Sequence, residues 1–141
     1  MPMLDTYIFF NGNCAEAMRF YEKTLGAKME TYLTYGQGPM PEGCPAGAEN
    51  QVMHACLLVD GRRLMASDML PQYGQKEMAG FCVSLTYDTA DEARRIFDAL
   101  SAGGTVTMPL GKTFWAEVFG SFTDRFGTPW MVNGALQPVG H

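Results

Sequence analysis

Two segments of the chain space their apolar residues as an amphipathic helix does, at positions i, i+3 and i+4. The apolar positions of the two stripes are Ala17, Phe20, Tyr21 and Leu25, and then Ala93, Ile96, Phe97 and Leu100. Gly26 follows the first stripe and the pair Gly103-Gly104 follows the second, and glycine ends a helix without a Cβ clash. The pattern therefore predicts two helices, each with one face to bury.

Both predicted helices open on a capping box. In this motif a short polar side chain bonds a free helix N–H, and a Glu three residues later reaches back to the cap. The first box is Asn13-x-x-Glu16 and the second is Thr89-x-x-Glu92. We therefore expect the two helices to begin next to Asn13 and Thr89.

Short apolar runs rich in aromatic and β-branched residues predict eight strands. They lie at residues 7–10, 28–35, 52–59 and 64–67, and then at 81–85, 105–110, 114–122 and 130–133. In each half of the chain one strand precedes the helix and three strands follow it. The predicted order of elements is βαβββ, twice.

The two halves also repeat one another in sequence. Residues 16–21 (EAMRFY) are echoed 76 positions later (EARRIF), and residues 61–67 align with residues 127–133. A chain of 141 residues is long enough for one continuous core but too short for two independent ones. The sequence therefore predicts an α+β fold, with a single domain over residues 1–141 built from units at about 1–69 and 79–136.

One connection, residues 36–50, contains seven glycines and prolines, more than a helix or strand tolerates. Long loops in compact domains often cover a functional site, and a disordered flap is the alternative. Both interpretations stay open at this point.

The charge balance argues against nucleic acid as a partner, because the chain has 15 acidic and 10 basic residues and no run of Lys or Arg is longer than two. No stretch approaches the ~20 apolar residues that a membrane span needs, and the first ten residues lack the features of a secretory signal. Four cysteines without CxxC spacing are expected to be buried thiols. We therefore expect a cytoplasmic protein with no membrane partner.

Five motifs together resemble one superfamily. They are FNGNCAEA at residues 10–17, FY at 20–21, MASD at 65–68, TFW at 113–115 and DRFGTPWMVN at 124–133. With the duplicated βαβββ unit, they resemble the vicinal oxygen chelate (glyoxalase/bleomycin resistance/dioxygenase) superfamily and its PhnB-like subfamily, often labelled demethylubiquinone methyltransferase-like. The resemblance implies two units forming a curved, barrel-like mixed sheet with helices outside, a small-molecule cavity inside, and a homodimer.

Catalytic members of that superfamily hold a divalent metal with His, Glu or Gln on the first and last strands of the two units. The corresponding stretches here offer Thr6, Ile8, Met65, Ser67, Phe81, Val83, Met131 and Asn133. None of these supplies the imidazole or carboxylate that Zn²⁺, Ni²⁺ or Fe²⁺ prefers. We therefore predict that the usual divalent metal is absent, and the sequence names no other cofactor.

The methyltransferase label does not fit the sequence. A typical class I methyltransferase binds its nucleoside cofactor at a glycine-rich turn between a strand and a helix of a doubly wound sheet. The one G-x-G sequence, at residues 36–38, runs into Pro39 and Pro41, and only two helices are evident. We expect no methyltransferase activity.

His54 is the one histidine besides the C-terminal His141, and it lies in the predicted strand 52–59. A cavity-facing imidazole could act as a base, as a hydrogen-bond donor or as one ligand of an atypical metal site. A core histidine bonded to a backbone carbonyl is the alternative, and the sequence does not decide which face carries it.

Ser67 and Asn133 occupy equivalent positions in the two halves, near the ends of strands that face inward by the family's geometry. They line a pocket together, or each closes a strand end by bonding local backbone. Asp68 has the opposite pleat parity to Ser67, so a turn role stands beside a catalytic one. Trp115 is the preferred pocket wall, whereas core packing or a dimer interface is favoured for Trp130.

The leading interpretation is a protein that binds an unidentified small molecule without the usual metal centre, with catalysis left open. The candidate ligand-binding residues are His54, Ser67, Asp68, Trp115 and Asn133. The alternative is a metal-dependent, glyoxalase- or dioxygenase-like enzyme whose shifted site includes His54 and Asp68.

Overall fold

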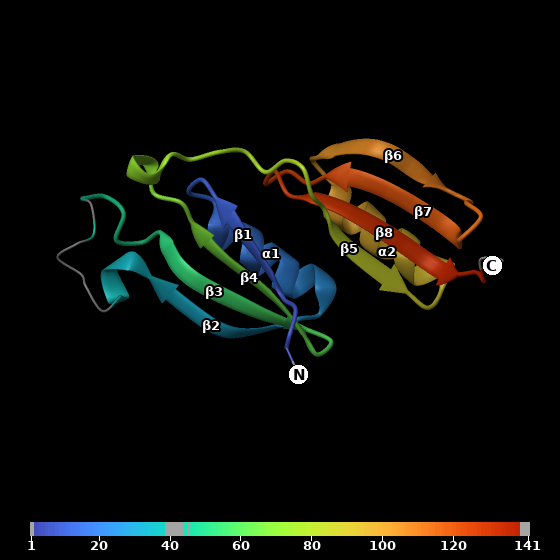
Figure 1. Cartoon of the computed structure of the whole chain (residues 1–141), viewed down its shortest axis with the longest axis horizontal. Helices are drawn as coiled ribbons and strands as arrows, with labels where there is room; N and C mark the ends of the chain where they lie inside the picture. The colour runs from blue at the N-terminus through green and yellow to red at the C-terminus, as the bar shows by residue number, and fades with distance from the viewer. Residues whose placement is uncertain (1, 39–43, 45, 139–141) are drawn as a thin grey trace. The chain divides into compact units, whose positions relative to one another are not determined.

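The computed structural model describes residues 2–38, 44 and 46–138, and the chain divides into two compact units, Met1–Glu77 and Met78–His141. Each unit contains a four-stranded sheet and one long helix (Figure 1). The predicted α+β class and the repeated βαβββ order are therefore confirmed. A single domain over residues 1–141 stays a prediction.

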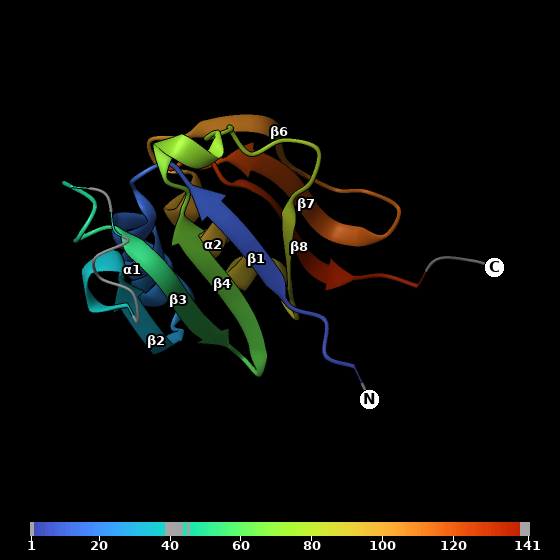
Figure 2. The same cartoon turned by 60° about the vertical axis from the view of Figure 1, so that its left-hand side comes forward.

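The first unit is a mixed sheet. Its elements are β1 (Thr6–Phe10), α1 (Cys14–Leu25), β2 (Lys28–Thr34), η1 (Tyr35–Gln37), β3 (Val52–Val59), β4 (Arg62–Asp68) and η3 (Pro71–Tyr73). The strands lie in the order β1-β4-β3-β2, and Figure 2 shows them side by side. β1 runs parallel to β4 and the other neighbours are antiparallel. Part of the predicted loop 36–50, residues 39–43 and 45, lies outside the described residues.

The second unit repeats this topology. Its elements are β5 (Val83–Tyr87), α2 (Ala90–Ser101), β6 (Thr105–Gly111), β7 (Ala116–Thr123) and β8 (Pro129–Leu136). The strands lie in the order β5-β8-β7-β6, with β5 parallel to β8. Two predicted strands are shifted in the structure. Phe81 lies before β5 because the pairing with β8 begins at Val83, and Trp115 lies just before β7.

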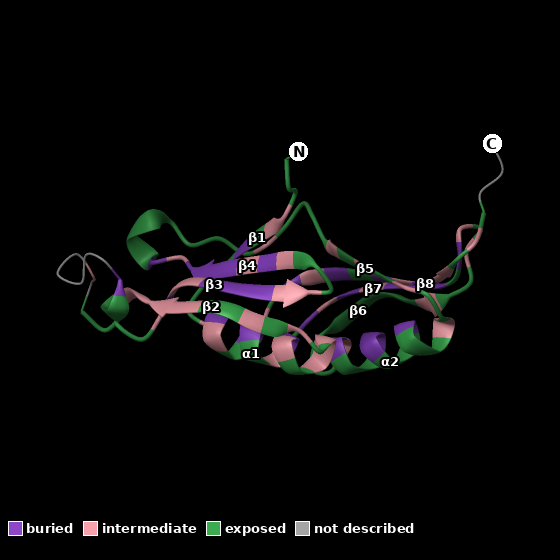
Figure 3. Cartoon of the chain, turned by 90° about the horizontal axis from the view of Figure 1, so that it is seen from below, coloured by how far each residue is buried: buried purple, intermediate pink, exposed green. Residues whose placement is uncertain are grey.

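Each helix buries one side against its own sheet, as the purple positions in Figure 3 show. The buried residues of α2 are the predicted stripe Ala93, Ile96, Phe97 and Leu100. The buried residues of α1 are Cys14, Ala17, Met18 and Tyr21. The prediction for α1 is therefore wrong for Phe20 and Leu25, which are half-buried at the margin of a stripe that is turned toward Met18.

The two helices are capped differently. Thr89 caps α2 as predicted, since its hydroxyl accepts a hydrogen bond from the backbone N–H of Glu92 at 3.2 Å. The side chain of Asn13 makes no capping hydrogen bond to α1, so the first predicted capping box is wrong. The backbone N–H of Cys14, the first residue of α1, instead donates to Asp68 Oδ1 at 3.0 Å. Asp68, on the last strand of the unit, therefore caps α1 in place of a residue next to the helix.

The alternation of side chains gives each sheet a second face, which the helix does not cover. On β1, Ile8 and Phe10 are buried on the side of α1, so Tyr7 and Phe9 point to the opposite side. We call this opposite side of each sheet the helix-free face. No helix in the described ranges is long and apolar enough to cross a membrane.

Strand pairing also fixes which positions of the two units are equivalent. Ser67 pairs with Phe9 in the first unit, and Asn133 pairs with Thr86 in the second. Both therefore lie on the helix-free face of their own sheet, at the same place in the ladder. The predicted equivalence of Ser67 and Asn133 is confirmed by this register.

Candidate functional site

A tyrosine and a histidine meet on the helix-free face of the first sheet. The Tyr7 hydroxyl on β1 lies 3.1 Å from His54 Nδ1 on β3, within hydrogen-bonding distance. The two rings are stacked, with centroids 5.6 Å apart and 27° between their planes. Tyr7 is 39% exposed and His54 is half-buried, so solvent reaches this pair.

Aromatic carbon and a hydroxyl group flank the Tyr7–His54 pair. The Phe9 ring lies 5.1 Å from the Tyr7 ring, and Phe9 is 47% exposed. Ser67 lies beside Phe9 in the strand ladder and is 5% exposed. Within the described part of the chain, the Ser67 hydroxyl makes no hydrogen bond to a strand-end backbone group. This face therefore combines apolar surface with groups that can bond a ligand.

Asp68 lies on the other side of β4 and ties the first unit together. Its Oδ1 accepts hydrogen bonds from the backbone N–H groups of Gly12 and Cys14, at 2.9 and 3.0 Å. Its Oδ2 accepts one from the N–H of Val52 at 2.8 Å, and the residue is 1% exposed. The Tyr35 hydroxyl donates to the Asp68 carbonyl at 2.8 Å, and burial together with the Asp68 charge raises the pKa of Tyr35. The structure does not bring Asp68 to the face that carries His54.

A thiol lies on the helix-free face in the same row of the strand ladder as Tyr7. Cys56 is in register with Met65, which pairs with Tyr7, and Cys56 Sγ lies 3.8 Å from Glu30 Oε1. Burial, and then the neighbouring Glu30 carboxylate, raise the pKa of Cys56. The thiol is therefore protonated at neutral pH, which is unfavourable for a nucleophile or a metal ligand.

The donors on the helix-free faces do not fit the metal centre that the family resemblance implies. On the first and last strands of the two units, these faces carry Tyr7, Phe9, Met65, Ser67, Ser84, Thr86, Met131 and Asn133. Among the described residues, no three His, Cys, Asp or Glu side chains are grouped so that they could hold a metal ion. His54 Nδ1 is already bonded to a phenol hydroxyl, and one imidazole is not a metal site.

In the second unit, the structure brings together the predicted residues Trp115 and Asn133. The Trp115 indole N–H donates to Asn133 Oδ1 at 2.9 Å. Trp115 is half-buried, and its ring meets Phe119 and Phe114 edge to face, with centroid distances of 5.1 and 4.9 Å. An aromatic wall with an amide beside it is thus built on the segment before β7 and on β8.

Trp130 is a core residue. It is 1% exposed, and its indole N–H donates to Asp124 Oδ2 at 2.8 Å. Asp124 Oδ1 also accepts from the backbone N–H groups of Phe126 and Thr128, which closes the turn before β8. Trp130 therefore packs in the core of the second unit, in agreement with the core-packing interpretation of the sequence.

One recess on the second unit has a volume of about 380 Å³. It is lined by Asp88, Thr89, Ala90, Asp91, Arg94, Glu117 and Ala135. Its walls are short and charged, with three carboxylates and one guanidinium. None of the candidate residues lines this recess, so it does not coincide with either aromatic face.

Tyr7 is the functional candidate that the sequence reading did not name. The available signal was the alternation of β1, where Ile8 and Phe10 fit a buried face and leave Tyr7 and Phe9 on the other. Its pairing with His54 depends on β1 and β3 lying on either side of β4, which only the sheet order reveals. The pattern of one strand could not supply that contact.

The comparisons with known proteins agree with the fold. The family described as "Glyoxalase/Bleomycin resistance protein/Dioxygenase superfamily" has a model that matches residues 3–132, which is most of the chain. The chain belongs to this superfamily. The protein YjdN from Escherichia coli K12 is 37% identical over 145 aligned residues, and the alignment covers 97% of each protein.

Two solved structures place this superfamily member more narrowly. Protein PA1353 from Pseudomonas aeruginosa is 46% identical with a TM-score of 0.88, covering 95% of this chain and 98% of that one. A PhnB protein from Bacillus cereus, named as a 3-demethylubiquinone-9 3-methyltransferase, is 25% identical with a TM-score of 0.77, covering 95% of this chain and all of that one. The resemblance to the PhnB-like branch of the superfamily is therefore confirmed.

Proposed function

We propose that this superfamily member binds a small organic molecule on the helix-free face of its first sheet. The observation that carries the proposal is the Tyr7–His54 hydrogen bond, which lies on a solvent-accessible face instead of in the core. Ligand sites typically combine aromatic walls with a few polar groups that fix orientation. Phe9 supplies further aromatic carbon, and Ser67 supplies a hydroxyl group.

The binding takes place without the metal centre of the catalytic relatives. The strand positions of that centre carry phenol, thioether, hydroxyl and amide side chains, which are poor ligands for Zn²⁺, Ni²⁺ or Fe²⁺. A shifted metal site would need a second strong donor beside His54. Asp68 does not supply it, because its carboxylate carries three backbone hydrogen bonds on the other side of β4.

The methyltransferase name of the Bacillus cereus relative is not extended to this chain. A nucleoside cofactor is commonly bound at the free N–H groups of a strand-to-helix turn. At the turn into α1, the N–H groups of Gly12 and Cys14 already donate to Asp68. Each sheet here has one helix on one face, whereas a doubly wound sheet carries helices on both.

Metal analysis tests the metal-free part of the proposal. Protein purified without chelators is expected to contain no stoichiometric Ni, Zn, Mn or Fe. A stoichiometric ion that is lost in a His54→Ala variant would overturn this part. It would also revive the metal-dependent glyoxalase- or dioxygenase-like alternative.

Ligand titration tests the binding site itself. The probes are catechol, a glutathione hemithioacetal and fosfomycin, followed through the side-chain NMR signals of Tyr7 and His54. Tyr7→Phe removes only the hydroxyl, and is expected to weaken a binding probe about tenfold. Tyr73→Phe is the matched control, because Tyr73 is 69% exposed and lies in η3, outside the strands of the sheet. The proposal fails if no probe binds, or if Tyr7→Phe and His54→Gln both bind with unchanged affinity.

Homodimerisation, which the family resemblance implies, is part of the same proposal. Sedimentation velocity on the full chain checks it directly. A species of twice the mass of 15.5 kDa is expected, and a monomer at all concentrations would contradict it.

A further inference from the structure

The backbone around Trp115 is held in one conformation by its neighbours. Thr113 Oγ1 accepts hydrogen bonds from the N–H groups of Trp115 and Ala116, at 3.3 and 3.2 Å. The Trp115 carbonyl accepts one from the N–H of Gln137 at 2.7 Å. These hydrogen bonds fix the backbone of Trp115, although the residue lies outside β7.

The indole ring is fixed as well. Its N–H is bonded to Asn133 Oδ1, and Phe119 and Phe114 meet it at interplanar angles of 67° and 84°. Edge-to-face pairs of this kind are among the favourable aromatic arrangements. A ligand that uses this ring would not have to order it, which preserves affinity.

The hydrogen bond to Trp115 also determines what Asn133 presents to the outside. An indole nitrogen can only donate, so the atom that faces it must be the amide oxygen of Asn133. The amide nitrogen, with two N–H donors, points to the other side. In residues 2–38, 44 and 46–138 this nitrogen has no hydrogen-bond partner, and it is not among the buried polar atoms left without one. It is therefore an accessible donor group.

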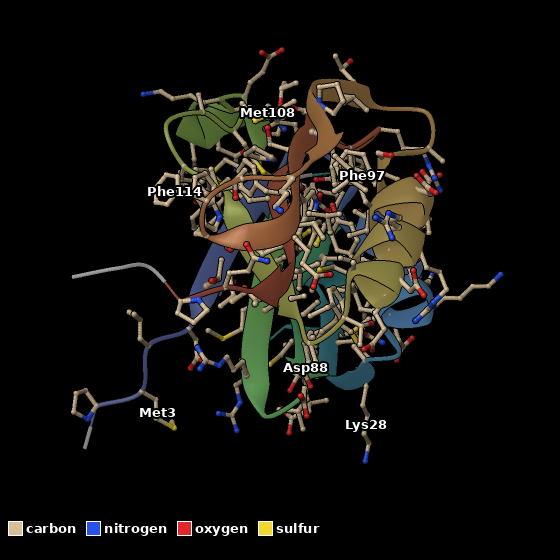
Figure 4. The ribbon with its side chains drawn as sticks, turned by 90° about the vertical axis from the view of Figure 1, so that its right-hand side faces the viewer. Met3, Lys28, Asp88, Phe97, Met108 and Phe114 are labelled. Atoms are coloured by element: carbon tan, nitrogen blue, oxygen red, sulfur yellow. The ribbon has the colours of Figure 1, made fainter. Side chains whose placement is uncertain are left out.

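Phe114 completes the arrangement at the surface. It is 73% exposed, and Figure 4 shows it at the margin of the second unit, whereas Phe97 lies between α2 and its sheet. An apolar ring with that exposure has surface left to bury. Aromatic surface and amide donors thus lie next to each other around Trp115.

We infer that Trp115, Phe114 and Asn133 form a second binding site, for a planar aromatic ring with a hydrogen-bond acceptor at its edge. The aromatic side chains take the ring, and the Asn133 amide donates to a carbonyl or carboxylate oxygen of the ligand. This site shares no residue with the Tyr7–His54 face and lies in the other unit. Ligand binding at this site can therefore be tested separately from the function proposed above.

The test uses two probes of similar shape and opposite polarity. Acetophenone carries only an acceptor, and benzamidine carries only donors. In the full-length protein, acetophenone is titrated to about 10 mM at physiological salt, which suits the weak affinity of so small a ligand and screens long-range charge. The signals followed are the indole N–H of Trp115 and the side-chain amide of Asn133. The indole N–H of Trp130 is an internal control, because Trp130 is buried.

The decisive variant is Asn133→Asp. Aspartate keeps an oxygen for the Trp115 N–H but has no amide donors, so acetophenone affinity is expected to fall about tenfold or more. Benzamidine is expected to bind Asn133→Asp more tightly than it binds the wild type. Unshifted ring-carbon signals of Trp115 and Phe119 in the unliganded variant verify that the aromatic wall is intact, since the indole N–H signal itself moves when its acceptor becomes a carboxylate.

Three results would overturn the inference. They are no response to acetophenone in the wild type, a response confined to signals outside Trp115 and Asn133, and unchanged preference between the probes in Asn133→Asp. If Asn133→Asp disturbs these ring-carbon signals, Asn133→Ser takes its place. That variant keeps an oxygen and one donor, and should bind acetophenone more weakly than Asn133 and more tightly than Trp115→Leu.

Discussion

Replacing Asp68 with asparagine tests the three backbone hydrogen bonds that the buried Asp68 carboxylate accepts in the first unit. The Asp68→Asn side chain has the same shape but one acceptor oxygen in place of two. If that oxygen keeps the N–H groups of Gly12 and Cys14, the new NH₂ group faces the N–H of Val52, which Asp68 Oδ2 now accepts at 2.8 Å. Two donors then meet in a place that is 1% exposed.

The magnitude follows from these contacts. One charge-assisted hydrogen bond is lost, the two others lose their charge, and one N–H is buried without a partner. Losing a hydrogen bond to a charged group costs about 1.5–3 kcal/mol, and an unpaired buried group costs about 1–3 kcal/mol. Because the losses overlap, we expect Asp68→Asn to lower the free energy of unfolding by about 2–4 kcal/mol.

Urea unfolding measures this loss. With a slope of about 2 kcal/mol per molar urea, the midpoint should fall by about 1–2 M. Asp60→Asn is the matched control, because Asp60 is exposed with φ of 46°, and asparagine tolerates that conformation. The control should change stability by less than about 0.5 kcal/mol. If Asp68→Asn behaves like its control, the assigned role of Asp68 is refuted.

The same experiment tests the single domain. Both tryptophans lie in the second unit, so their fluorescence reports on that unit, whereas circular dichroism reports on both. If the chain unfolds as one domain, Asp68→Asn shifts the two transitions together. A fluorescence transition that stays in place while the dichroism transition moves would contradict the predicted single domain.

Three further substitutions test other parts of the fold. Gly134→Ala would place a Cβ 2.6 Å from that of Ala93 and 2.8 Å from Val118 Cγ2, so we expect a loss of about 1–3 kcal/mol in urea unfolding. Gly111→Ala, with its nearest neighbour at 3.9 Å, should be close to neutral, and equal effects would contradict this packing. Thr89→Ala should cost about 1 kcal/mol by removing the cap of α2, whereas Thr89→Ser keeps the hydroxyl and should restore most of it. Burial and then the Asp68 charge raise the pKa of Cys14 in the folded protein above its ordinary 9.0. The folded state therefore holds the thiol proton more tightly than the unfolded chain does. This contribution to the free energy of unfolding is fully present below about pH 9 and is lost as the pH rises. Cys14→Ala should therefore reduce the alkaline fall in stability by up to about 1.4 kcal/mol per pH unit, and an unchanged pH dependence of unfolding would refute the assignment.

Much of the fold could be predicted because its signals are local. Strand β3 (Val52–Val59) has the predicted bounds, and α2 has the predicted cap and buried stripe. These features depend on side-chain periodicity and on residues within one helical turn of each other. A single sequence records both directly.

Apart from the buried stripe of α1, where Phe20 and Leu25 are only half-buried, the errors concern contacts between distant parts of the chain. The cap of α1 comes from Asp68 on β4, so the nearby Asn13-x-x-Glu16 motif misleads. The contact of Tyr7 with His54 joins residues 47 positions apart across an intervening strand. Such pairs depend on strand order and register, which a periodic pattern does not encode. The sequence predicts Trp115 and Asn133 as separate pocket residues, and not the hydrogen bond between them, because that bond depends on a turn outside the strand.

The unequal capping of the two helices has a consequence for the order in which the protein folds. The cap of α2 joins residues three positions apart, so the start of this helix can form early. The cap of α1 joins residues 54 positions apart and must wait until that long segment of chain has closed. We expect the transition state to contain the start of α2 and to lack that of α1. Kinetic φ-values near one for Thr89→Ala and near zero for Asp68→Asn would bear this out, and the reverse pattern would contradict it. Two copies of one topology can thus follow different folding routes.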